Sequence, residues 1–393
     1  MTVHTGNKGY LAIKKETTKG TIAAVPNVYV PFYDEKIFTN TNIDEDMPVM
    51  GHIFARYKSL LGMRSHGGDI TIKAEPNTAG YFLDMILAKG TTTGAGPYTH
   101  PFTLSTSADP KAYTWDIQKG QVVCRFLGSE LSELGVDFDK NKMVFKLKMS
   151  ALKSFIVREI ASVSGSGPYT ITLKTNYDPA PSDGLIIGDT MRLVKSDDST
   201  IDFVVDSIPD GVSITCSEDV SSLSAGDLIF IKAATPSYTL KADFMWALSQ
   251  FRFSDTASNA LSATQTRMEQ GSRWTLMNKF EADEGAQRSG SFDPAALVRT
   301  VGDMEIALKA AFDLPREINR YLTSSSRALV IRHFSEDQAY ELRITINNFK
   351  YKENAPIVKA GDPVYSEATV IPDYNTSDGQ SFDVKVLNNV SSF

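Results

Sequence analysis

Cysteine is scarce in this chain, and so are the features of exported or membrane proteins. The 393 residues include only Cys124 and Cys216, which are too few for a disulfide framework, so we expect both to be reduced packing residues. No run approaches the ~18 consecutive apolar residues of a membrane-spanning helix. The N-terminal MTVHTGNKGYLAIKKE lacks the apolar centre of a secretory signal. These features predict a protein made in a reducing cytoplasm, with no membrane partner.

An excess of positive charge is also missing. The formal net charge is −7, which argues against a basic surface that grips nucleic acid through its phosphates. The same balance is compatible with a surface past which DNA slides without specific binding. A hydrophobic fraction of 42% and a charged fraction of 22% are ordinary for a globular protein. The length exceeds one comfortable core, so two or three domains are expected.

Patterns that carry chemistry are absent as well. The chain has no G-x-S-x-G elbow, P-loop or H-E-x-x-H motif. His52 and His66 share one polar segment but have no acid or thiol at metal-ligand spacing, so solvated loop histidines are the plainer interpretation. The acidic clusters DEDMP (44–48) and EADEG (281–285) do not match an EF-hand, which favours solvated loops over calcium sites. We therefore predict no catalytic residue, no metal and no cofactor.

What the chain does contain is one local pattern written twice. GDITIKAE (68–75) leads into NTAGYFLDMILAKG (77–90), and GDMEIALKAAF (302–312) leads into DLPREINRYL (313–322). Each copy reads as a strand with one apolar face, followed by a short helix that an Asn or Asp opens. A β-unit built twice, with no catalytic cluster in either copy, is typical of a building block for an assembly.

The order of expected elements divides the chain into three parts, 1–160, 161–236 and 237–393. In the first, we expect strands at 28–38, 98–104, 111–118 and 121–127, and a hairpin over 135–149 that turns at 138–142. The middle part opens on the linker-like SGSGP and continues with many short strands, which suggest a small inserted barrel or sandwich. In the third, strands are expected at 239–253, 328–333, 340–351, 364–371 and 381–387. Residues 39–68 show no clean period, and so long an irregular segment is more often functional.

Several segments of the first part resemble the tail tube proteins of long-tailed bacteriophages. The resemblance rests on LAIKKETTKGTIAAVPNVYVPFYDEKI, on GDITIKAEPNTAGYFLDMILAKG after a long loop, and on GPYTHPF. It covers the first part well and the third more loosely, and the middle part lies outside it. It implies a mainly β fold: two tail-tube-like sandwiches, each with one flanking helix, and a small β-domain inserted between them.

The same resemblance implies a structural role. Tube domains of that family join their sheets in a ring around a channel, and a long loop, here 40–67, reaches the adjacent ring. The implied partners are further copies of the chain, as a ring of three two-domain chains or of six, and the tape measure, tail terminator and distal tail proteins. DNA passes through the lumen of the virion tail. The candidate inter-ring residues are Asp44, Glu45, Asp46, His52, Phe54, Arg56, Tyr57 and Arg64, with Glu281, Asp283, Glu284 and Arg288 in a second loop.

The sequence also leaves two other functions as alternatives. A tail-tip or surface adhesin would use the middle part as a receptor binder, and exposed aromatic rings there would favour it. That part has few aromatics (Tyr169, Tyr177, Phe203 and Phe230) and no Trp. An enzyme such as a wall hydrolase would need an acid–base pair that the sequence does not offer. Trp115, Trp246 and Trp274 lie in strand-like runs, where we expect core or subunit-interface anchors.

Overall fold

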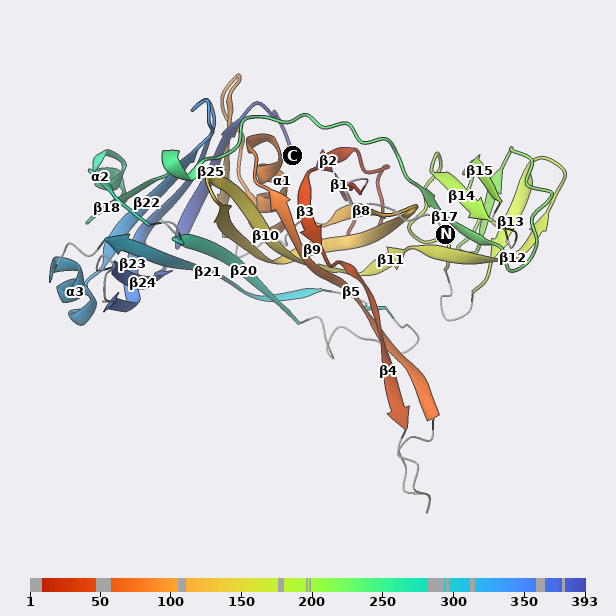
Figure 1. The fold of residues 1–393 in the computed structure, drawn as a ribbon, viewed down its shortest axis with the longest axis horizontal. Helices are drawn as coiled ribbons and strands as arrows, with labels where there is room; N and C mark the ends of the chain where they lie inside the picture. Colours follow the sequence, from red (N-terminus) through yellow and green to blue (C-terminus); the bar gives the residue numbers. More distant parts are fainter. Residues whose placement is uncertain are drawn as a thin grey trace, which may run out of the picture.

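The computed structural model describes residues 9–46, 58–104, 111–175, 180–195, 197, 199–269, 271–281, 293–294, 297–311, 315–357, 365–376 and 379–393. Antiparallel strands dominate these residues, and the helices among them are short (Figure 1). The mainly β fold expected from the sequence is confirmed.

The elements fall into three groups along the chain. The first comprises β1 (Leu11–Lys15), β2 (Val28–Val30), β3 (Phe32–Glu35), β4 (Phe38–Asp46), β5 (Lys58–Lys73), α1 (Pro76–Ile86), β6 (Ala88–Lys89), β7 (Tyr98–Thr103), β8 (Tyr113–Lys119), β9 (Val122–Asp139), β10 (Lys142–Ala151) and β11 (Lys153–Phe155). The second comprises β12 (Val157–Ser164), β13 (Tyr169–Leu173), β14 (Thr190–Val194), β15 (Thr200–Val204), β16 (Ser213–Cys216) and β17 (Leu228–Lys232). The third comprises η2 (Trp246–Leu248), β18 (Gln250–Ser254), α2 (Ala257–Ser262), β19 (Gln265–Thr266), β20 (Arg273–Glu281), β21 (Val298–Ala311), α3 (Pro315–Leu322), β22 (Arg327–Phe334), β23 (Glu341–Ile357), β24 (Tyr365–Pro372) and β25 (Phe382–Asn388).

Alternation of apolar and polar residues explains the strands that the sequence predicts well. In β10, Phe145, Leu147 and Met149 are buried, whereas Lys146 and Lys148 are exposed. Side chains of a strand point alternately to its two faces, so one face of β10 packs on the core and the other meets solvent. Residues 121–127 and 135–138, expected as separate strands, form the single long strand β9.

Eight strands form one continuous antiparallel sheet in the order β4–β5–β10–β9–β20–β21–β24–β23. The order consists of two equivalent groups of four, each made of two hairpins. The sequence repeat is therefore a repeat of sheet topology, and the pairing of β9 with β20 joins the two copies within one chain (Figure 1).

The β-bulges confirm that the two groups correspond residue by residue. The ladder of β9 with β10 shifts register between Leu131 and Glu133, and that of β23 with β24 shifts between Tyr351 and Glu353. The first hairpin, β4–β5, has its shift at Thr41/Ile43, and the second, β20–β21, at Lys279/Phe280. A bulge fixes register locally, so these shifts align the copies independently of sequence.

The two Gly-Asp pairs of the sequence repeat do not occupy equivalent positions in the two four-strand groups. Gly68 pairs with Met149, whereas the residue of β21 at the matching ladder position is Ile306, which pairs with Val370. Gly302 consequently lies four positions nearer the hairpin end than Gly68 does. The order of strand and then helix recurs in both copies, but the two sequences are not in register, and α3 leaves Leu322 73% exposed whereas α1 is buried in the core.

The opposing layer of each sandwich uses the other halves of the long strands. In the first copy it contains β1, β8, β11 and the first half of β9. In the second copy it contains β18, β22, β25 and the first half of β23, and β7 of the first part pairs with β25. Helix α1 fills the core with Phe82, Leu83 and Met85, which are fully buried. It ends at Ile86, earlier than the Gly90 that the sequence suggested, because the chain becomes extended at Leu87.

One hydrophobic cluster runs through both sandwiches, and a second fills the middle part. The second consists mainly of residues between Ile160 and Ile231, with contributions from Tyr10, Ala12, Val123 and Phe155 of the first part. Both cysteines are buried and free, as expected.

Three expectations about local structure were wrong. Residues 39–68 are not an irregular loop, since their described portions form the long β4–β5 hairpin. Residues 239–253 are mostly irregular, with a short 3-10 turn at Trp246 and only β18 at their end. The strand expected over 28–38 is divided among β2, β3 and β4, with Pro31, which has no N–H to donate to a ladder, at the first break. Trp115 and Trp274 are buried in strands, as expected of core anchors.

Candidate assembly surfaces

The β4–β5 hairpin projects away from the body of the molecule (Figure 1). Ile43 on β4 is 64% exposed and Phe38, at the base, is 47% exposed. Asp44, Glu45 and Asp46 end β4, and Arg64 lies on β5. The remaining sequence candidates of this segment, His52, Phe54, Arg56 and Tyr57, lie outside the described residues. A projecting hairpin with exposed apolar side chains fits a contact with another subunit.

The base of this hairpin is tied to the connection between β20 and β21. His66 is buried, and its Nε2 lies 3.0 Å from Asp293 Oδ1 while its Nδ1 lies 2.9 Å from Thr39 Oγ1. Arg64 Nη1 lies 3.8 Å from the same Asp293 oxygen. Burial would raise the pKa of Asp293, but the hydrogen bond and charge of His66 and the charge of Arg64 lower it overall. His66 is thus not a solvated loop histidine, and its acidic partner is 227 residues away in the sequence.

The second candidate loop occupies the equivalent place in the repeat. Glu281 ends β20 and pairs with Val298 on β21. The equivalent residue of β4 is Asp44, which pairs with Leu60 two residues before that strand ends. Asp283, Glu284 and Arg288 lie outside the described residues. The two segments singled out in the sequence are therefore the ends of equivalent hairpins.

The joint between the two copies is a short antiparallel ladder. Trp274 is opposite Val136 and Leu276 is opposite Leu134, with all four side chains in the core. Trp274 Nε1 donates a hydrogen bond to His333 Nε2 at 3.2 Å, and His333 Nδ1 lies 2.8 Å from Ser249 Oγ. Burial of apolar area and a satisfied polar network thus fix the joint.

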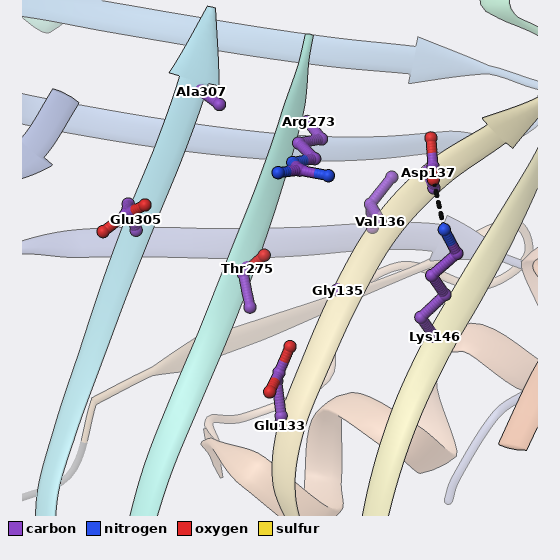
Figure 2. A pocket seen from close by; sticks show the side chains of 9 residues that line it. All are labelled: Glu133, Gly135, Val136, Asp137, Lys146, Arg273, Thr275, Glu305 and Ala307. Carbon is purple, nitrogen blue, oxygen red and sulfur yellow. Dashed lines mark hydrogen bonds and ion pairs between the residues drawn. The ribbon is translucent and has the colours of Figure 1, made fainter. Parts of the chain in front are cut away.

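The other face of the sheet across this joint is polar and mixed in charge. Glu133, Asp137, Lys146, Arg273 and Glu305 line a shallow hollow there (Figure 2). Lys146 Nζ donates to Asp137 Oδ2 at 2.5 Å. Although partial burial raises it, the pKa of Asp137 is lowered overall by this bond and by the backbone N–H of Phe138. Acids and bases are interspersed, so the face presents no single-sign field.

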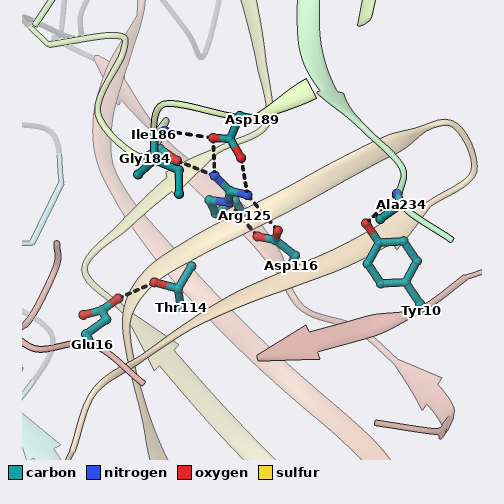
Figure 3. Close-up of polar contacts among 9 residues, drawn as sticks. All are labelled: Tyr10, Glu16, Thr114, Asp116, Arg125, Gly184, Ile186, Asp189 and Ala234. Carbon is teal, nitrogen blue, oxygen red and sulfur yellow. Dashed lines mark hydrogen bonds and ion pairs between the residues drawn. The ribbon is translucent and has the colours of Figure 1, made fainter. Parts of the chain in front are cut away.

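The middle part is fastened to the first by a buried cation. Arg125 on β9 is fully buried, and its Nε donates to Asp116 Oδ1 on β8 at 2.7 Å (Figure 3). Its Nη1 donates to Asp189 Oδ2 at 2.7 Å and to the Gly184 carbonyl at 2.9 Å. Nearby, Ala234 N donates to the Tyr10 hydroxyl at 3.2 Å, and burial raises the pKa of Tyr10 to about 12.

A family comparison decides the class of the protein. A family model described as phage tail tube protein matches residues 6–271. The chain belongs to this family. The matched range includes the middle part, which the resemblance seen in the sequence did not cover, and it ends just before β20. The protein is accordingly a structural protein of the phage tail. The search of curated proteins finds no match.

Within the part of the chain that the structure describes, no helix is long and apolar enough to cross a membrane. No group of three or more His, Cys, Asp or Glu side chains in that part could hold a metal ion.

Proposed function

We propose that this protein is the major tail tube subunit, which forms stacked rings around a channel for DNA. The observation that supports the proposal is the continuous sheet of two equivalent four-strand groups, because further copies of the chain could extend such a repeat into a cyclic sheet. A heterologous contact repeated by rotation closes into a ring. With two groups per chain, three chains supply a ring of six. The division into parts at 1–160, 161–236 and 237–393 belongs to the same proposal.

The polar face of the sheet is the face that we assign to the channel. Its opposite face packs on the core and on α1, so only the polar face is available to a lumen. Acidic and basic side chains are interspersed on this face, namely Glu133, Lys146, Arg273 and Glu305. A row of cations alone would attract each DNA phosphate, and the acidic residues between them weaken that attraction. DNA then passes without specific binding.

The β4–β5 hairpin and the β20–β21 connection are assigned to contacts between rings. Asp44, Glu45, Asp46 and Arg64 would meet complementary charge on the next ring, which fixes orientation more than affinity. Assembly in the host cytoplasm and contacts with tape measure, terminator and distal tail proteins complete the proposal. The described residues of the middle part give the adhesin alternative little support, because Phe203 and Phe230 are buried and Tyr169 is only partly exposed. Tyr177 lies outside the described residues.

Negative-stain electron microscopy of the concentrated protein tests the proposal, with tubes of constant axial repeat as the expected result. A matched variant joins Ile43 to Leu61, which are opposite each other in the ladder, through an Asn-Gly turn. Its pairing of β5 with β10 begins only at His66, so the fold should survive and circular dichroism should match the parent. We expect this variant to form rings that do not stack. Globular particles of the parent under every assembly condition would refute the tube, and tubes of the shortened variant would refute the hairpin's role.

A further inference from the structure

The continuous sheet has two outer edges, and they lie at opposite ends of its strand order. At one end, β4 is paired with β5 on one side. At the other end, β23 beyond Phe349 is paired with β24 on one side. Among the described residues, no strand is hydrogen-bonded to the opposite side of either segment. An open strand edge is a template for pairing with another chain.

The internal joint shows what such a pairing looks like in this fold. There, β20 and β9 pair with Thr275 opposite Gly135 and Met277 opposite Glu133. β20 and β9 occupy, in their own copies, the places that β4 and β23 occupy at the outer edges. Each outer edge strand is therefore equivalent to one of the two strands that pair at the internal joint. We expect it to accept the same kind of partner strand.

Because the bulges of the two copies match, the residue pairing of the internal joint can be transferred to the outer edge strands β4 and β23. On the first side, Thr275 pairs with Glu305 and Phe38 pairs with Gly67, which are equivalent positions of β21 and β5. On the second side, Glu133 and Glu353 each follow the equivalent bulge. Phe38 thus corresponds to Thr275, and Ala355 corresponds to Gly135.

We infer that β4 of one copy pairs antiparallel with β23 of a second copy, with Phe38 opposite Ala355 and Asn40 opposite Glu353. The inference rests on the proposed function and specifies its subunit contact. Because the two edges lie at opposite ends of the sheet, the contact is heterologous and each copy uses both edges once, which permits ring closure.

Side-chain chemistry at the two edges is complementary in this register. Phe38 is 47% exposed, and the small side chain of Ala355, itself exposed, leaves room for the ring. The internal joint also places a small residue opposite a larger one. Gly135 has no side chain, and a Cβ there would lie 3.5 Å from Thr275 Oγ1. The amide of Asn40 can donate to the exposed carboxylate of Glu353.

Engineered disulfides test the register directly, because directly opposite residues of an antiparallel pair have Cα atoms about 4.5–5.5 Å apart, within disulfide reach. The test variant is Phe38→Cys with Ala355→Cys. The matched positive control is Thr275→Cys with Gly135→Cys, which is the equivalent pair inside one chain. The off-register control is Phe38→Cys with Lys350→Cys, farther along the same strand. The native cysteines are buried, so they contribute little background.

Each oxidised variant is run on a non-reducing gel before and after assembly. We expect the positive control to oxidise within the monomer. The test pair should give covalent multimers only after assembly, up to one closed species of three chains, and the off-register pair should give none. Parent tubes in the microscope, together with a test pair that stays monomeric or an off-register pair that cross-links equally, would overturn the register and leave the tube intact. Absence of rings and tubes in the parent would instead overturn the function itself.

Discussion

The guanidinium of Arg125 and the carboxylate of Asp189 form a buried ion pair between two parts of the chain, with Nη1 2.7 Å from Oδ2. Asp116 binds the other side of the same guanidinium, so one cation serves two carboxylates. All three groups are almost fully buried. Removing one member of such a group is costly because the remaining charges stay buried without compensation.

We therefore expect Arg125→Met to destabilise the protein by about 3–5 kcal/mol. Its exposed counterpart, Arg192→Met, breaks only the surface pair with Asp202 and should cost at most about 1 kcal/mol. Urea unfolding measures both changes. Hydrogen exchange should additionally show faster exchange over 182–195 in Arg125→Met alone. Equal, small shifts for the two variants would contradict a fastening role for Arg125.

Patterns local to one strand were predictable from the sequence. Met143, Phe145, Leu147 and Met149 share a face in the sequence and are all buried in the structure. The strand-then-helix repeat was equally visible, because it needs only neighbouring residues. The turn residues of 138–142 placed the β9–β10 hairpin correctly.

Contacts between distant segments were not predictable. Asp293 approaches His66 across 227 residues, and neither residue has a local signal for the other. Arg125 occurs in the apolar run VVCRF, where alternation gives no reason to bury a cation, and its partner Asp189 lies in the middle part, beyond the linker-like SGSGP. The pairing of β9 with β20 depends on which edges are left open by the rest of the fold, which a single sequence does not specify.

The hydrogen bond from Trp274 to His333 predicts a pH dependence of stability. Burial lowers the pKa of His333 from 6.5 to about 3, so the folded protein holds the ring neutral while the unfolded chain can protonate it. The stability that neutral His333 contributes is complete above about pH 6.5 and is lost as pH falls toward 3. The loss is about 1.4 kcal/mol per pH unit within that interval.

The comparison variant is His333→Gln, whose amide can accept from Trp274 but does not titrate. Between about pH 6.5 and 5, where most carboxylates remain ionised, its unfolding free energy should fall less steeply than that of the parent. His100 also has a pKa lowered by burial, so some slope will remain. Parallel curves for parent and variant in urea titrations would exclude His333 as a source of the dependence.

Gly68 allows a close approach of backbones at the base of the first hairpin. Its φ of +146° is one that other residues rarely adopt, and a Cβ there would lie 2.3 Å from the Lys36 carbonyl oxygen. We expect Gly68→Ala to cost about 1–3 kcal/mol or more. Gly135→Ala, whose nearest neighbour would be 3.5 Å away, is the matched control and should change stability far less. Thermal unfolding of the two variants measures the contrast, and similar shifts would show that the hairpin base can relax.

We expect the charge of the polar face, which we assign to the channel, to decide whether an assembled tube retains DNA. Reversing Glu133, Glu305 and Glu367, all on this face, to Lys should make assembled tubes retain a short duplex. Retention should weaken steeply with salt, because each phosphate contact releases counterions. As a control, Asp206, Glu218 and Asp219 of the middle part, all exposed, receive the same reversal. DNA held in a lumen is sheltered from a nuclease, whereas DNA on the outer surface is not. We therefore expect nuclease protection in the first variant only. Protection of DNA by the control variant, or by neither variant, would place the polar face outside the channel.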